Sequence, residues 1–104
     1  MPGLFMTPPD HVNFKAKPLF GAEGAIKDGA IAYLAPQGGG PTTPHTHAHD
    51  HLFIVVKGEA KILRGDDVVI VGANEAFRVT GTIPHAIWNN LDDETVMIGI
   101  SILA

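Results

Sequence analysis

Four histidines alternate along seven residues near the middle of the chain: His45, His47, His49 and His51. Imidazole is the commonest protein ligand for metals near neutral pH, because it can bind a metal while it is uncharged. Residues two apart on a β-strand point to the same face of a sheet. We therefore expect His45 and His47 to form half of a chelating site, which needs further ligands from elsewhere.

Two more histidines are candidates to complete this site. His51 follows His47 by four residues, past an expected turn, at the start of the next expected strand. His85 comes directly after Pro84, where another strand is expected to begin. Four neutral nitrogen donors suit iron, manganese, nickel, zinc, cobalt or copper, whereas calcium and magnesium prefer oxygen ligands. The expected cofactor is one divalent transition metal of open identity.

Composition narrows the class of protein. The 104 residues suit a single domain over residues 1–104, and the hydrophobic share of 45% is typical of a globular chain. The absence of cysteine excludes disulfides and thiolate zinc sites. A net charge of −4, without any basic run, argues against nucleic acid or an anionic membrane as partner.

The N-terminal residues suggest neither a leader nor a membrane anchor. They lack a charged segment followed by an apolar one, and no apolar run in the chain is long enough to span a bilayer. We therefore expect a cytoplasmic protein. Residues 1–10 hold three prolines and are expected to form a loosely ordered N-terminal arm.

Glycines and prolines divide the rest of the chain into short segments rich in β-branched and aromatic residues. No segment keeps a helical period over ten or more residues. A glycine-rich turn is expected at residues 37–41. Strands are expected at residues 11–16, 30–35, 42–47, 52–57, 60–64, 68–71, 76–79, 85–89 and 95–103. This pattern predicts an all-β fold, an antiparallel sandwich or barrel.

Two expected strands are apolar on both faces, at residues 54–56 and 96–102. Such strands are either buried inside one barrel or covered from outside by a second subunit. An exposed C-terminal strand of this kind would be an aggregation-prone edge. We therefore expect a homodimer in which strands of the two subunits cover one another.

The spacing of the histidines resembles the first sequence motif of the cupin family, G-x5-H-x-H-x3-4-E-x6-G. Every interval of that motif is matched from Gly39, through His45, His47 and His51, to Gly58. One position departs, because His51 stands where the family usually has glutamate.

The second cupin motif, G-x5-P-x-G-x2-H-x3-N, is matched more loosely. Its end, His85-x3-Asn89, is intact. Upstream, Val79 replaces the usual proline, and one extra residue separates Gly81 from His85. The two motifs and the region between them cover residues 39–89, which is about half of the chain.

The resemblance implies a small single-domain cupin (a cupin type-2 conserved barrel). Its fold would be an antiparallel β-barrel of two sheets, the jelly-roll arrangement known as the double-stranded β-helix. It also implies one divalent metal held by His45, His47, His51 and His85, since cupins with four histidines are a recognised variant. Without a glutamate ligand the site keeps a charge of about +2, which strengthens its attraction for anionic ligands, and it loses a potential carboxylate base.

Alternation along the strands predicts what surrounds the metal. If the ligating histidines point into the barrel, so do residues two or four positions further along the same strands. With one residue from the last strand added, this predicts a substrate pocket lined by Phe53, Val55, Ile87 and Met97. An apolar lining favours a small organic molecule as the partner.

Other polar residues near the motifs are expected to stay outside the ligand set. Because a turn should follow His47, His49 is expected to be exposed or to lie behind the ligands. Asp50 is either a turn residue or an acceptor for an imidazole N–H. His11 is expected on a surface strand away from the site, and no separate catalytic acid or base is indicated.

Three functions are compatible with these features. The first is a metal-dependent enzyme with dioxygenase-, isomerase- or cyclase-like chemistry on a small organic substrate. The second is a non-catalytic ligand-binding or sensing cupin, and the third is a barrel whose metal only stabilises the fold. Coordination separates them, because four ligands close a tetrahedral zinc site but leave two positions open around an octahedral ion.

Overall fold

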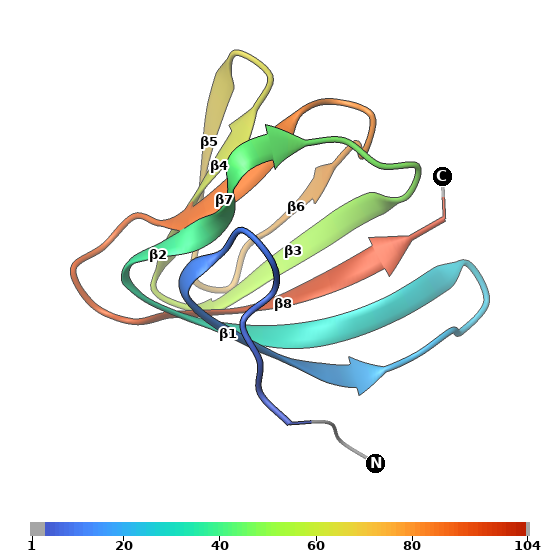
Figure 1. The fold of residues 1–104 in the computed structure, drawn as a ribbon, viewed down its shortest axis with the longest axis horizontal. Helices are drawn as coiled ribbons and strands as arrows, with labels where there is room; N and C mark the ends of the chain where they lie inside the picture. Colours follow the sequence, from blue (N-terminus) through green and yellow to red (C-terminus); the bar gives the residue numbers. More distant parts are fainter. Residues whose placement is uncertain (1–3, 104) are drawn as a thin grey trace.

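The computed structural model describes residues 4–103, which form an antiparallel β-barrel (Figure 1). This part of the chain contains no helix, and so none that is long and apolar enough to cross a membrane. The all-β, jelly-roll prediction is confirmed. The strands are β1 (Val12–Phe20), β2 (Ile26–His45), β3 (Asp50–Lys57), β4 (Glu59–Arg64), β5 (Asp67–Gly72), β6 (Ala76–Val79), β7 (His85–Asn89) and β8 (Thr95–Ile102).

Strand β2 runs through both walls of the barrel. Hydrogen bonding orders the strands as β5-β4-β7-β2-β8-β3-β6, and β1 pairs with β2 outside this path. The first part of β2 pairs with β1 and β8, whereas its last part pairs with β7. The end of β2 and the start of β7 therefore meet, and His45 lies opposite His85.

The predicted turn at residues 37–41 is wrong, since β2 continues through it as a single strand. Gly39 and Gly40 adopt φ angles of 150° and 151°, which favour glycine. A Cβ on Gly39 would collide with the carbonyl oxygen of Ile87 on β7. The glycines therefore allow β2 to change partners and approach β7 closely, where the sequence suggested a chain reversal.

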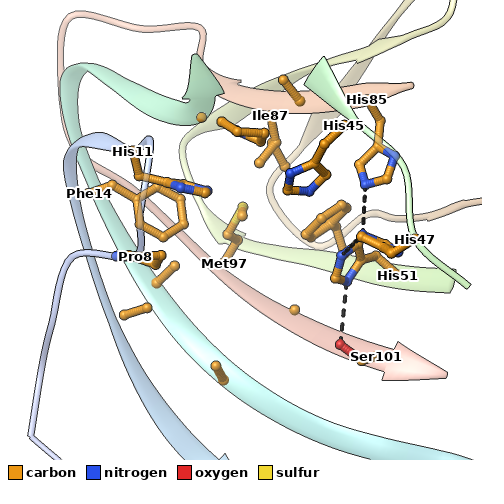
Figure 2. Close-up of a pocket in the computed structure, with 18 of the residues that line it drawn as sticks. Pro8, His11, Phe14, His45, His47, His51, His85, Ile87, Met97 and Ser101 are labelled. Atoms are coloured by element: carbon orange, nitrogen blue, oxygen red, sulfur yellow. Dashed lines mark hydrogen bonds between the residues drawn. The ribbon is translucent and has the colours of Figure 1, made fainter. Parts of the chain in front are cut away.

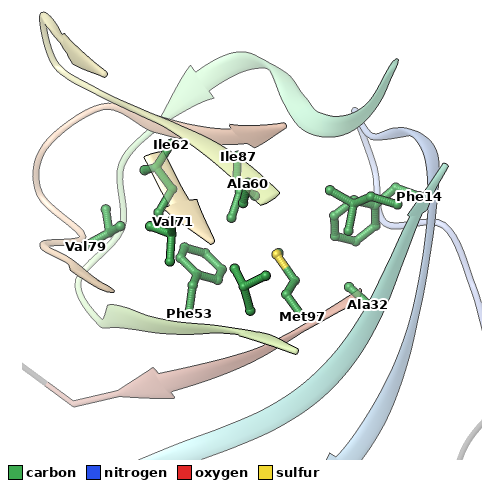
Figure 3. Close-up of a cluster of buried hydrophobic side chains, with 11 residues drawn as sticks. Phe14, Ala32, Phe53, Ala60, Ile62, Val71, Val79, Ile87 and Met97 are labelled. Carbon is green, nitrogen blue, oxygen red and sulfur yellow. The ribbon is translucent and has the colours of Figure 1, made fainter. Parts of the chain in front are cut away.

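The apolar core lies inside the barrel (Figure 3). Its placement follows strand alternation: Phe53 and Val55 of β3 point inward and are buried, whereas Ile54 between them is half-buried on the outside. Burial of each large aliphatic side chain contributes about 1.5–3 kcal/mol. The buried cluster consists of Phe14, Ala32, Leu34, Phe53, Val55, Ala60, Ile62, Val71, Val79, Ile87 and Met97.

The outer face of the β2–β8–β3 sheet carries a row of half-buried isoleucines. Ile31, Ile98 and Ile54 are neighbours in register across these three strands. The homodimer, in which a second copy of the chain would cover this row, stays a prediction.

The N-terminal segment folds back along β1. Residues 1–3 of the predicted arm lie outside the described residues. Met6 exchanges two backbone hydrogen bonds of 2.8 Å with Ala16, and the Thr7 hydroxyl donates to the carbonyl of Phe14 at 2.9 Å. This path brings Pro8 and His11 to the mouth of a cavity in the barrel.

Candidate metal centre

Five histidines, the four implied by the cupin resemblance among them, gather at one end of the barrel (Figure 2). Their ligand nitrogens form two groups that share His47: His45, His47 and His85, and His47, His49 and His51. His45 ends β2, His85 begins β7, and His51 lies near the start of β3. The Nε2 atom of His47 lies 3.0 Å from Nε2 of His51 and 3.1 Å from Nε2 of His85. Ligand nitrogens of His45, His47 and His85 all lie within 4.8 Å of one another.

His47 reaches this group from a loop rather than from a strand. The prediction that His45 and His47 share one strand is wrong, because β2 ends at His45. The backbone N–H of His47 instead donates to the carbonyl of Gly81 at 2.9 Å, in the loop before β7. The chain thus leaves strand β2 after His45, and the loop before β7 holds His47 in position through Gly81.

Hydrogen bonds fix the proton positions in two of the rings. Nδ1 of His47 lies 2.8 Å from the carbonyl oxygen of His49, and Nδ1 of His85 lies 2.7 Å from that of Ile83. A carbonyl oxygen only accepts, so each Nδ1 carries the proton of its neutral ring. The two Nε2 atoms, 3.1 Å apart, then face each other with lone pairs. Such a pair is repulsive unless a proton or metal cation lies between them.

The nitrogen separations at His47 suit pairs of ligands on one ion. Metal–nitrogen bonds of about 2.1 Å place two ligands about 3.0 Å apart at a right angle, and about 3.4 Å apart at the tetrahedral angle. The separations at His47 are 3.0 and 3.1 Å. They match two ligands at a right angle, whereas His51 shares its group of nearby nitrogens with His47 and His49 and not with His45 and His85.

Burial favours the neutral form, which can bind a cation, in three of these imidazoles. Burial, followed by the like charge of His47 and the other histidines, lowers the pKa of His51 to about 3. Burial also lowers the pKa of His85 and, together with His47, that of His45. Protons therefore compete with a metal less effectively here than at an exposed histidine.

His49 lies against the ligand group. The sequence predicted that it would be exposed or lie behind the ligands. Its ring stacks on His47, with centroids 4.0 Å apart and planes 6° apart, and it offers a nitrogen within 4.8 Å of those of His47 and His51. An imidazole binds a metal in its ring plane, so one ion cannot lie in the nearly parallel planes of both His47 and His49. We refer to His45, His47, His49, His51 and His85 as the histidine cluster.

Asp50 supports the cluster through the backbone. Its carboxylate accepts hydrogen bonds from Gly81 N–H at 2.9 Å and from Nε and Nη2 of Arg78 at 3.1 and 2.9 Å. The hydrogen bond from Gly81, followed by those from Arg78, lowers the pKa of Asp50. Gly81 in turn accepts from His47 N–H, so Asp50 positions His47 indirectly. Of the two alternatives expected for Asp50, the hydrogen bond from an imidazole does not occur among the described residues, and the residue begins β3 instead of forming a turn.

A cavity of about 340 Å³ opens beside the cluster. Its wall includes Phe53, Ile87 and Met97 of the predicted pocket, together with Phe14 of β1. Val55 does not line it, because this residue lies two positions further along β3 and is fully buried in the core.

His11 lines the same cavity, contrary to the expectation that it lies away from the site. No motif signals this residue. Its position depends on the return of the N-terminal segment along β1, which is a long-range feature of the fold.

The family model described as "Cupin domain" matches residues 31–102, well over half of the chain. A search of curated proteins found no match. Solved structures of similar fold include the polyketide cyclase RemF from Streptomyces resistomycificus, which is 19% identical with a TM-score of 0.76. That match covers 95% of this chain and 71% of the cyclase.

Two further structures share the fold. The Cupin_2 domain of an XRE family transcriptional regulator from Enterobacter cloacae is 21% identical with a TM-score of 0.75, covering 89% of this chain and 99% of that domain. A predicted oxalate decarboxylase from Thermotoga maritima is 14% identical with a TM-score of 0.76, covering 92% of each chain. Identities this low show the fold alone. The barrel and the extent of the family match together show that this chain belongs to the cupin family.

Proposed function

We propose that this cupin binds one divalent transition metal ion and acts as an enzyme on a small organic molecule in the adjoining cavity. The observation that carries the proposal is the pair of facing lone pairs on His47 and His85, 3.1 Å apart. The ligands would be His45, His47, His51 and His85. His49 would pack against His47 outside the ligand set.

The donor set and the walls define what the site can do. When bound, a divalent ion supplies a Lewis acid that polarises a substrate oxygen, and a redox-active ion can also activate dioxygen. The neutral imidazoles bring no compensating negative charge, so they favour a substrate with an anionic oxygen. Phe53, Ile87 and Met97 exclude water and pack against the apolar part of the substrate.

The class of reaction is proposed as dioxygenase-, isomerase- or cyclase-like. Structural neighbours described as a polyketide cyclase and a predicted oxalate decarboxylase show that this barrel hosts more than one chemistry. A non-catalytic ligand-binding or sensing role is the alternative. It is favoured by the fold shared with a domain of a transcriptional regulator and by the histidine at position 51, where the family usually has a carboxylate.

Metal titration tests the ligand set. After treatment with a chelator, the chain should bind one cobalt(II) ion, detected by its visible absorption and by elemental analysis. His47→Ala and His85→Ala should weaken binding beyond the 10–100-fold that is typical for loss of an outer partner. His49→Ala is the matched control, because it removes a neighbouring imidazole and should leave one ion bound.

Two results would contradict the proposal. If His49→Ala abolished binding while His51→Ala preserved it, the assignment of ligands would be wrong. If cobalt bound with a closed tetrahedral spectrum that added carboxylates did not change, the metal would be structural and the enzyme proposal would fail.

A further inference from the structure

The segment before β1 brings an imidazole, His11, to the mouth of the cavity, across from the histidine cluster (Figure 2). Its ring packs edge-on against Phe14, with centroids 4.6 Å apart. It also lies against the backbone of β2, since a Cβ on Gly40 would come within 2.7 Å of it. The carbonyl of Asp10 accepts a hydrogen bond of 2.7 Å from the N–H of Thr42. The ring is therefore held in place by neighbouring structure.

One nitrogen of His11 is available to a ligand. Nδ1 lies 2.8 Å from the carbonyl oxygen of Pro9, which can only accept, so Nδ1 carries the proton of the neutral ring. Nε2 then presents a lone pair, and no side chain or backbone group among residues 4–103 makes a hydrogen bond to it. This nitrogen can accept a hydrogen bond from a molecule in the cavity.

The remaining polar groups of the cavity lie at the other end. Apart from histidines, the polar side chains that line its described part are Asp28 and Ser101, which pair in register on β2 and β8. Ser101 Oγ lies 3.5 Å from Nδ1 of His51, beside the histidine cluster. Between the two ends the wall is apolar, with Met97 visible between His11 and His51 in Figure 2.

We propose that His11 selects ligands that carry a hydroxyl group at the end remote from the metal, with Nε2 accepting the hydrogen bond. This inference rests on the proposed function, because the metal fixes the other end of the ligand through an anionic oxygen. The apolar section between the two ends fits a ring. The ligand class is therefore a small aromatic acid with a ring hydroxyl.

The size of the effect follows from the position of His11. Its side chain is half-buried, so the hydrogen bond replaces one that water makes in the free protein. A net contribution of this kind corresponds to about tenfold in affinity. His11 would thus be a specificity-determining residue that contacts the ligand directly.

The test uses cobalt(II)-loaded protein with 3- and 4-hydroxybenzoate and, as near-isosteric partners, 3- and 4-methylbenzoate. The wild-type chain should prefer the hydroxyl compound by about tenfold in at least one pair. His11→Phe retains a ring against Phe14 but no acceptor, and should remove the preference by weakening hydroxybenzoate binding alone. His11→Gln, whose amide oxygen accepts, should keep part of it.

A measurement without any variant supplements these affinities. In zinc-loaded protein with 15N-labelled histidine, the Nε2 resonance of His11 should shift with the preferred hydroxybenzoate but not with its methyl partner. The inference is overturned if neither pair shows a hydroxyl preference, if His11→Phe keeps it, or if cobalt binds but no benzoate does. Failure of cobalt to bind would overturn the proposed function itself.

Discussion

Strand β7 contributes one buried side chain to each of two polar clusters, and the two clusters differ in how far their hydrogen bonds are satisfied. His85 begins the strand and Asn89 ends it. The Asn89 amide donates to the carbonyls of Leu34, Ala35 and Asp93 at 3.0, 3.1 and 2.7 Å.

The other atoms of the Asn89 cluster are also paired. The amide oxygen of Asn89 accepts from Leu91 N–H at 2.9 Å and from the Thr95 hydroxyl at 2.7 Å. In the histidine cluster, by contrast, Nε2 of His47 and Nε2 of His85 face each other with lone pairs. A saturated polar cluster stabilises a fold, whereas an unsaturated one is ready for a cation. His85 and Asn89 both belong to the second cupin motif, which therefore combines a residue for the site with a residue for the fold.

The largest expected effect concerns the saturated cluster. Asn89→Leu keeps the shape of the side chain but leaves the carbonyls of Leu34, Ala35 and Asp93 without their donor. The free energy of unfolding should fall by about 4 kcal/mol, since the Leu34 carbonyl and the Thr95 hydroxyl lose a buried partner and each unsatisfied buried group costs about 1–3 kcal/mol. Urea denaturation of the metal-free chain measures this loss.

The cobalt affinity of the same variant shows whether the two clusters act independently. Cobalt binding per folded chain should be unchanged in Asn89→Leu, whereas His47→Ala should lose cobalt and keep the stability of the metal-free protein within about 1 kcal/mol. Thr95→Val removes one partner of Asn89 and should cost about 1 kcal/mol. A similar loss of cobalt affinity in Asn89→Leu and His47→Ala would show that the two clusters are one functional unit.

The sequence predicts some parts of this structure better than others. The barrel and the gathering of the four histidines at one end of it are predictable, because the motifs encode local spacing: a turn after His47, and a strand that begins at His85. The path of β2 is not, because a glycine run permits either a tight turn or a close approach to another strand. The structure takes the second outcome, with Gly39 packed against the backbone of Ile87 and Trp88 on β7.

Long-range contacts account for what the sequence could not predict. His11 reaches the cavity because Met6 pairs with Ala16, and no pattern in the first residues signals this pairing. Asp50 and Arg78 are 28 positions apart, so neither residue indicates its partner. For His49 the sequence shows the spacing from His47, but it does not predict the stacking of the two rings, because that depends on the loop conformation.

The next largest effect is on the pH dependence of the metal-free protein. The pKa of His51 falls from 6.5 to about 3 on folding, chiefly through burial, so below pH 6.5 the unfolded chain takes up a proton that the folded chain refuses. The neutral ring therefore makes its whole contribution to the free energy of unfolding above pH 6.5, and this contribution is lost as the pH falls toward 3. The loss should reach about 3 kcal/mol at pH 4. Urea denaturation between pH 7 and 4, with chelator present, measures it.

A matched variant identifies the titrating group. His51→Gln removes this ring, so its stability should fall less over the same range, while the carboxylates still titrate in both proteins. The lowered pKa of Asp50 costs stability mainly below pH 3.8, at the acid edge of this window, and does so equally in both proteins. Equal pH dependence in the two proteins would show that His51 does not control acid stability.

The smallest expected effect tests whether Asp50, whose hydrogen bonds are satisfied, helps to position the histidine cluster. Asp50→Ala removes the acceptor for Gly81 N–H and thereby loosens the carbonyl that holds His47. Cobalt affinity should fall by about tenfold, as expected for an outer partner of a ligand. Asp50→Asn retains an oxygen for Gly81 while losing the charge opposite Arg78, so it should bind cobalt nearly as tightly as the wild type. Equal losses in the two variants would assign the effect to the ion pair instead of to the positioning of His47.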